Sequence, residues 1–142
     1  MDTTHLRIEA EPAFADMQFL EDRLYEYSAE KTGVDDGQWL AIFLRDDQHT
    51  IQAGLGGWTW CGSCYISSVW VHKDLRGQGV GTKLLQAAEQ EARRRGSQRI
   101  ILSSFSFQAP GFYQKLGYKV EHVLYGFPEG YKYYTLIKVI GS

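Results

Sequence analysis

The sequence contains no long apolar run and very few cysteines. None of its segments approaches the roughly 20 apolar residues that a membrane span requires. The first eleven residues include charged and polar side chains where a secretory signal would be apolar. These are Asp2, His5, Arg7, Glu9 and Glu11. We therefore expect a cytoplasmic protein that makes no membrane contact.

The only two cysteines are Cys61 and Cys64. Their C-x-x-C spacing occurs in zinc and redox sites, but a zinc site needs a second pair of ligands at a suitable spacing, and we find none. Both lie where a hairpin turn is expected, in a protein assigned to a reducing compartment. We expect no bound metal, and redox chemistry is the less favoured alternative.

No linker or internal repeat interrupts the 142 residues, of which 44% are hydrophobic and 23% charged. This composition predicts a single globular domain over 1–142. The net charge of −2 hides an asymmetry: residues 1–47 carry twelve acids and four bases, a net −8, and residues 48–142 carry five acids and eleven bases, a net +6. Either acids cover a solvated helix face, or the two segments face ligands of opposite charge.

Hydrophobic periodicity and turn residues predict a mixed α/β domain. A mostly antiparallel sheet with helices on both faces is expected, in the order β-α-β-β-β-α-β-α-β-β. The predicted elements are a strand at 6–10, a helix at 12–31, strands at 39–45, 50–60 and 65–71, a helix at 80–95, a strand at 99–105, a helix at 108–116, and strands at 118–125 and 131–139.

A glycine-rich loop joins the third strand of the predicted meander to the following helix. It contains the pattern Arg76-x-x-Gly79-x-Gly81. A loop of this kind brings free backbone N–H groups and the positive end of a helix together, and such a place binds phosphate.

Two common nucleotide motifs do not match this loop. The nucleotide P-loop places Ser or Thr after its lysine, whereas Lys83 is followed by Leu84. The dinucleotide fingerprint needs a third glycine at its sixth position. Counted from Gly77, that position is Thr82, and counted from Gly79 it is Leu84.

The loop instead resembles that of the GNAT acetyltransferases, in which Arg/Gln-x-x-Gly-x-Gly/Ala holds the pyrophosphate of acetyl-CoA. A second motif, Ala109-x-x-Phe112-Tyr113-x-Lys115-x-Gly117-Tyr118, is similar to the family's Phe/Leu-Tyr-x-Lys-x-Gly-Phe/Tyr helix. The two motifs occur in the family's order, and the predicted element order agrees with its fold. The resemblance covers most of the chain.

The resemblance implies acetyl-CoA as co-substrate and a role for each matching residue. The strand Val69, Trp70 and Val71 would pair with the pantetheine arm, and Tyr113 would protonate the departing thiolate. Ser106 occupies the place of an asparagine that contacts pantetheine in many relatives. The loop residues that would hold the pyrophosphate are Arg76, Gly77, Gln78, Gly79, Val80, Gly81 and Thr82. At Gly79 and Gly81 a Cβ would block the approach of phosphate.

The general base and the acceptor stay open. The third strand offers Ser67 and Ser68 but no acid, and the other candidates are Glu26, Glu30, Glu129 and His72. Eight aromatic residues could line an acceptor pocket, pack the core or form a dimer contact. They are Trp58, Trp60, Phe105, Phe107, Phe127, Tyr131, Tyr133 and Tyr134.

The expected function is an N-acetyltransferase that moves acetyl from acetyl-CoA to a primary amine by direct transfer in a ternary complex. In relatives the first helices and the last hairpin turn form the acceptor side, so the acidic 1–47 segment favours a cationic small molecule. The alternatives are a protein N-acetyltransferase and a non-catalytic acyl-CoA-binding module. The run Arg93-Arg94-Arg95 is attributed to a helix end, so no nucleic acid is expected. A homodimer is among the expected assemblies.

Overall fold

The computed structural model describes residues 1–141, which fall into two units divided between Asp35 and Asp36. The N-terminal unit contains one helix, α1 (Phe14–Thr32). The helix ends at Gly33, whose left-handed conformation (φ 74°) lets its N–H donate to the carbonyl of Ala29.

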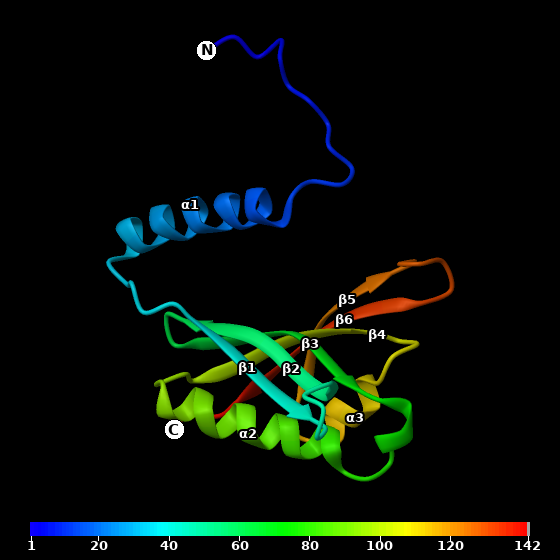
Figure 1. Cartoon of the computed structure of the whole chain (residues 1–142). Coiled ribbons are helices and arrows are strands. Elements are labelled where there is room, and N and C mark those ends of the chain that lie inside the picture. The colour runs from blue at the N-terminus through cyan, green and yellow to red at the C-terminus, as the bar shows by residue number, and fades with distance from the viewer. Residues whose placement is uncertain (142) are drawn as a thin grey trace. The chain divides into compact units, whose positions relative to one another are not determined.

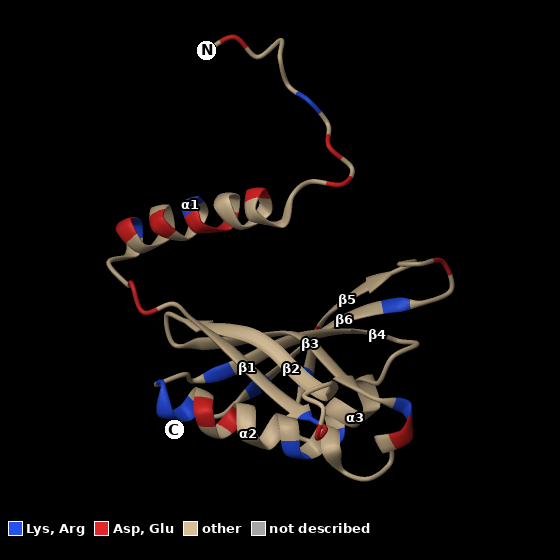
Figure 2. Ribbon diagram, in the orientation of Figure 1, with Lys and Arg blue, Asp and Glu red and all other residues tan. Residues whose placement is uncertain are grey.

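The strand predicted at 6–10 is wrong. These residues have no strand structure, and the side chains of Leu6 and Ile8 are exposed. A strand requires a hydrogen-bonded partner, and two apolar residues between charged ones bury too little surface to hold one. Figure 2 shows acidic residues along this unit, as the charge asymmetry indicated.

The second unit is built on a six-stranded sheet with the order β1-β2-β3-β4-β6-β5 (Figure 1). All neighbouring strands are antiparallel except β3 and β4. This confirms the predicted mixed α/β fold and its meander. The strands are β1 (Gln38–Arg45), β2 (Ile51–Trp60), β3 (Ser63–Val71), β4 (Arg99–Phe105), β5 (Lys119–Tyr125) and β6 (Lys132–Val139).

Parallel β3 and β4 need a crossover, which α2 (Val80–Arg94) supplies. Both α2 and the short α3 (Pro110–Lys115) lie on one face of the sheet (Figure 1). The expectation of helices on both faces depends on α1 and stays a prediction. No helix within residues 1–141 is long and apolar enough to cross a membrane.

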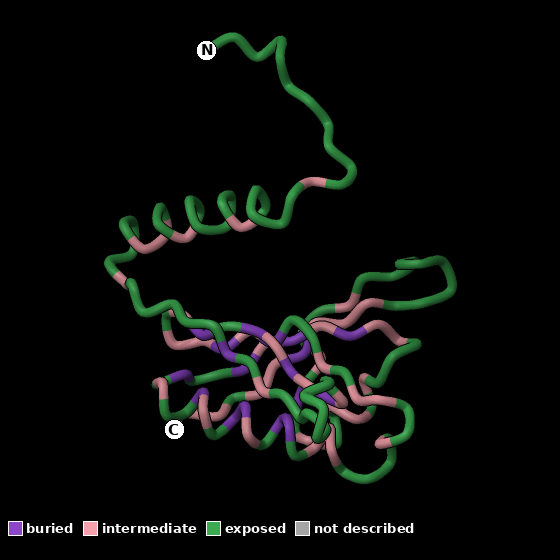
Figure 3. The backbone as a smooth tube through the Cα atoms, in the orientation of Figure 1, coloured by how far each residue is buried: buried purple, intermediate pink, exposed green. Residues whose placement is uncertain are grey.

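The core lies between α2 and the sheet, where Figure 3 shows the buried residues gathered. The helix contributes an apolar stripe whose members recur at helical spacing. These are Leu84, Leu85, Ala88 and Ala92. The strands contribute the alternate residues that point to the same face, including Leu55, Ile66, Ile100, Leu102 and Leu136.

Strands β3 and β4 pair for only four residues and then separate. The ladder runs from Ser63 opposite Arg99 to Ile66 opposite Leu102, while β3 continues to Val71. A bulge at Ser67 accompanies the separation, because Gly57 pairs with Ile66 and Gly56 with Ser68.

Gly57 explains why the bulge forms here. A Cβ on this residue would lie 1.9 Å from the carbonyl oxygen of Tyr65, so only glycine can occupy the position. The glycines of β2, which weaken it as a strand in isolation, therefore shape the split in the sheet.

Candidate active site

The separated end of β3 presents backbone groups to the split. The N–H of His72 donates to the carbonyl of Gln52 on β2 at 2.8 Å. Amide groups along a strand point alternately to its two sides, so the N–H groups of Val69 and Val71 point away from β2, toward the split. Trp70 lies between them with its side chain 48% exposed.

Arg76 is attached to the end of this strand. Its Nε donates to the carbonyl of Val71 at 3.1 Å, while the residue itself stays exposed. The guanidinium therefore sits where the strand ends and the glycine loop begins. The 3₁₀ turn η1 (Lys73–Leu75) fills the connection, and the side chain of Gln78 donates to the carbonyl of Asp74 at 3.1 Å.

The glycine loop delivers the N-terminus of α2 beside the split. Gly77 and Gly79 have φ of 74° and 81°, a region that favours glycine. The first intrahelical bond runs from the N–H of Lys83 to the carbonyl of Gly79 at 3.1 Å. The N–H groups of Val80, Gly81 and Thr82 lie in the turn before it, so the helix itself cannot pair them.

Gly81 has a packing role in addition to the phosphate role expected from the sequence, which stays a prediction. A Cβ here would lie 3.2 Å from Cζ of Phe112 on α3, whereas nothing lies within 4 Å of a Cβ on Gly79. Gly79 is required by its backbone conformation, and Gly81 allows α3 to pack closely against α2.

Tyr113 lies next to Phe112 on α3 and is half-buried. Its ring contacts those of Phe112 and Tyr118 edge-on, at centroid distances of 5.2 and 6.0 Å. Burial raises the pKa of the Tyr113 hydroxyl. The phenol is therefore protonated at neutral pH and can act as a proton donor.

The hydroxyl of Ser106 takes part in a hydrogen bond with the backbone of β6. Its Oγ accepts the N–H of Lys132 at 2.9 Å, and its own N–H donates to the carbonyl of Lys132 at 2.8 Å. These bonds fix the chain after β4 against β6. The hydroxyl hydrogen is still able to donate, so the pantetheine contact stays a prediction.

The candidate bases differ in how the structure places them. Nδ1 of His72 accepts the N–H of Asp74 at 3.1 Å. In the neutral ring Nε2 then carries the hydrogen. His72 therefore presents a hydrogen-bond donor at Nε2 rather than a free nitrogen that could accept a proton. Glu129 is exposed in the turn between β5 and β6. Glu26 and Glu30 belong to α1 in the N-terminal unit.

Five of the eight aromatic residues form one cluster at the end of β4 and the β5–β6 turn. Their ring centroids lie 4.6 to 5.6 Å apart in successive contacts. Phe107, Phe127 and Tyr131 are each about half exposed. We call the set of Phe105, Phe107, Phe127, Tyr131 and Tyr133 the aromatic cluster.

The other three predicted aromatics lie elsewhere. Trp58 contacts Tyr65 at 5.4 Å between ring centroids, and Tyr134 packs against the core. Trp60 lines a separate cavity, so the eight residues do not form a single pocket.

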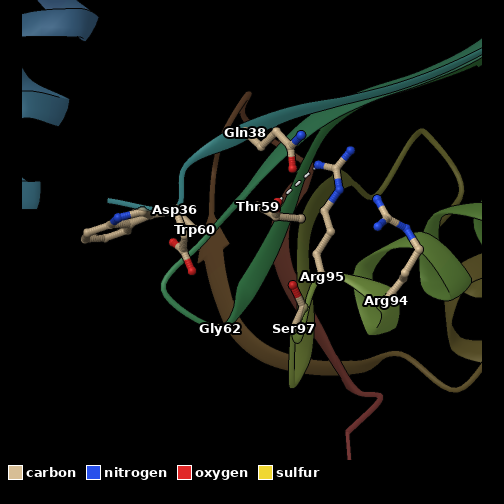
Figure 4. Close-up of a pocket in the computed structure, with 8 residues that line it drawn as sticks. All are labelled: Asp36, Gln38, Thr59, Trp60, Gly62, Arg94, Arg95 and Ser97. Carbon is tan, nitrogen blue, oxygen red and sulfur yellow. Dashed lines mark hydrogen bonds between the residues drawn. The ribbon is translucent and has the colours of Figure 1, made fainter. Parts of the chain in front are cut away.

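That cavity, of about 300 Å³, was not expected from the sequence (Figure 4). It lies at the C-terminal end of α2, about 20 Å along the helix from the glycine loop. Arg95 donates to Thr59 Oγ1 at 3.1 Å and to the carbonyl of Trp39 at 2.9 Å. The lining residues are Asp36, Gln38, Thr59, Trp60, Gly62, Arg94, Arg95 and Ser97.

Two features singled out in the sequence fall in this region: Trp60 and the run of three arginines. Glu91 accepts hydrogen bonds from Arg94 and Arg95, which lower the pKa of its carboxyl to about 2. The run thus forms a local ion-pair network at the helix end.

Together, the split sheet and the glycine loop form a site suited to a phosphorylated ligand with an extended arm. The arm can pair with the free edge of β3, while phosphate can meet the first-turn amides of α2. A half-buried phenol lies on the neighbouring short helix.

Comparison with known proteins identifies the class. The model of the acetyltransferase (GNAT) family matches residues 4–118, and the chain belongs to this family. An acetyltransferase of Agrobacterium fabrum is 33% identical over 99 residues, which cover 70% of this chain and 72% of that protein. Blasticidin-S acetyltransferase of Streptomyces morookaense is 32% identical over 105 residues, covering 69% and 73%. The protein is thus an acyl-CoA-dependent N-acyltransferase.

Solved structures agree on the fold. A crystal structure of a protein from Agrobacterium tumefaciens superposes with a TM-score of 0.84 at 27% identity, covering 96% of this chain and 99% of that one. An aminoglycoside 6′-N-acetyltransferase solved with coenzyme A gives a TM-score of 0.64 at 21% identity, covering 73% and 74%.

Proposed function

We propose that the protein transfers acetyl from acetyl-CoA to a primary amine, directly, in a ternary complex. The observation that carries this proposal is the position of the split beside the N-terminus of α2. A ligand with a pyrophosphate and an amide-bearing arm, such as CoA, can use both. Nothing lies within 4 Å of a Cβ on Gly77 or Gly79, so the loop surface is open to phosphate.

In this proposal the chain contributes binding, polarisation and a proton. The amides of Val69 and Val71 pair with the arm, and one of them donates to the acetyl oxygen, where negative charge develops during transfer. Arg76 and the amides of residues 78–82 hold the pyrophosphate. As the C–N bond forms and the C–S bond breaks, Tyr113 gives its proton to the departing thiolate, and the proton that the amine loses restores the phenol. The raised pKa of Tyr113 keeps the phenol protonated before the transfer.

We propose a cationic small molecule as acceptor. Two features support this class: the acidic side chains of residues 1–47, and the half-exposed rings of the aromatic cluster next to Ser106. Aromatic ring faces attract ammonium groups, most strongly when the site excludes water. One relative is named as a blasticidin-S acetyltransferase, which supports a small-molecule acceptor.

The test measures release of CoA thiol over a panel of polyamines, aminoglycosides, lysine peptides and anionic amino acids. We expect turnover with cations and a strongly reduced turnover in Tyr113→Phe. Turnover confined to anionic amino acids contradicts the cationic acceptor. A mass shift only on a protein identifies a protein N-acetyltransferase, and acetyl-CoA binding without turnover on any amine identifies a non-catalytic module.

Isothermal titration with acetyl-CoA provides the independent control. Absence of binding contradicts the assignment of the glycine loop.

The cytoplasmic location, the single domain over 1–142 and the homodimer stay predictions. Sedimentation of the purified chain in an analytical ultracentrifuge measures the oligomeric state.

A further inference from the structure

A carboxylate occupies a core position of α2. Glu89 recurs at helical spacing with Leu85 and Ala92 on the buried stripe, and it is only 6% exposed. Its Oε1 lies 2.7 Å from Nζ of Lys138 on β6, and Arg93 Nη2 is 3.9 Å away. An ion pair with one buried partner and one mostly buried partner contributes little net stability compared with apolar residues of similar volume. Its presence calls for another explanation.

The second oxygen of Glu89 leads to Tyr118. The hydroxyl of Tyr118, a residue 2% exposed, donates to Glu89 Oε2 at 3.3 Å. The stem of Lys138 passes over Gly117, where an added Cβ would lie 3.3 Å from Lys138 Cε. The ion pair therefore holds the junction between α3 and β5 from two sides.

Tyr118 in turn holds Tyr113. The N–H of Tyr118 donates to the carbonyl of Tyr113 at 3.1 Å, and the two rings meet edge-on at 6.0 Å. Helix α3 has only six residues, too few to be stable without tertiary contacts. The orientation of the Tyr113 hydroxyl thus depends on what holds Tyr118.

We propose that Glu89 is a positioning residue for Tyr113. The Glu89–Lys138 pair fixes the Tyr118 hydroxyl, and Tyr118 fixes the last turn of α3 and with it the phenol. The proposal rests on the proposed function, in which Tyr113 is the general acid. A misplacement of about 1 Å at a reacting group can lower a rate about a hundredfold, so contacts that hold Tyr113 in place can affect kcat strongly.

The first test does not require activity. 3-Fluorotyrosine at position 113 reports the ring environment by fluorine NMR. The double variant Glu89→Leu/Lys138→Met replaces the pair with apolar side chains and should remain folded. We expect one sharp resonance in the wild type and a broadened or split resonance in the double variant and in Tyr118→Phe. Leu40→Val, a core change on β1 at the opposite end of the strand order from β5, controls for general destabilisation and should keep the single resonance.

The second test is a double-mutant cycle on kcat. We expect Glu89→Leu/Lys138→Met to lower kcat about tenfold or more, with the Kd of acetyl-CoA changed by less than about twofold. In a Tyr113→Phe background the same pair of changes should lower kcat by less than about twofold, because the group it positions is gone.

An unchanged resonance at position 113 in the folded double variant overturns the proposal. Equal losses of kcat in both backgrounds also overturn it, since they show a structural effect that does not act through Tyr113. If no amine is acetylated, the proposed function fails, and the fluorine resonance alone still decides whether Glu89 positions Tyr113.

Discussion

Gly81→Ala separates two explanations for the third glycine of the loop. If the glycine serves phosphate, the added methyl group weakens acetyl-CoA binding. If it serves packing, the methyl group meets Phe112, because the new Cβ lies 3.2 Å from Cζ of that ring. A contact this close requires the Phe112 ring, or α3 with it, to shift by a few tenths of an ångström.

The expected magnitude is a difference between two opposing effects. Alanine in a helix is favoured over glycine by about 0.5–1 kcal/mol. Crowding a packed site costs about 1–3 kcal/mol. The net result is a destabilisation of about 1 kcal/mol, which lowers Tm by about 3–6 °C for a chain of this size.

Phe112→Leu provides the matched background, because it removes the ring that the methyl group would meet. There, Gly81→Ala should become stabilising by about 0.5–1 kcal/mol, so the sign of the effect reverses. Thermal unfolding of the four proteins, with titration of acetyl-CoA into each, measures both quantities. The same destabilisation in both backgrounds, or a raised Kd in both, refutes the packing explanation.

Three further predictions follow from the site and the sheet. Tyr113→Phe should lower kcat by about 10²-fold or more while the Kd of acetyl-CoA stays unchanged, and a wild-type kcat in the variant would exclude the phenol as general acid. The raised pKa of Tyr113 predicts that the general acid stays protonated as pH rises from 7 to 9. Gly57→Ala should destabilise the protein by more than about 4 kcal/mol, because a Cβ would lie 1.9 Å from the Tyr65 carbonyl oxygen, and soluble protein with a wild-type Tm would contradict the bulge. The pKa of Glu91, lowered to about 2, gives stability that is present above the unfolded pKa near 4.5 and lost as pH falls from there to 2. The Tm difference between wild type and Glu91→Gln should therefore vanish over that range, and a constant difference would be inconsistent with the ion pairs.

Much of the local structure could be predicted from the sequence because it depends on near neighbours. The spacing of Leu84, Leu85, Ala88 and Ala92 determines the buried face of α2 through the helical repeat. The order of residues in the glycine loop excludes the other nucleotide motifs, because each motif depends on register. The strand at 6–10 was wrong because a strand needs a partner, and no local pattern supplies one.

The tertiary structure decided the features that depend on distant residues. Gly57 and Tyr65 create the bulge only because β2 and β3 pair in this register. The loop after β4 is fixed by Ser106 and Lys132, which are 26 positions apart.

The contacts of Gly81 and Glu89 also depend on residues that are distant in the sequence. The sequence placed Gly81 at the start of a helix, and only the folded structure shows that Phe112 packs against it. The periodicity of α2 placed Glu89 on its buried face, but the folded sheet brings Lys138, 49 positions away, to its carboxylate. Periodicity specifies which face a residue occupies, and only the assembled layers specify what it meets there.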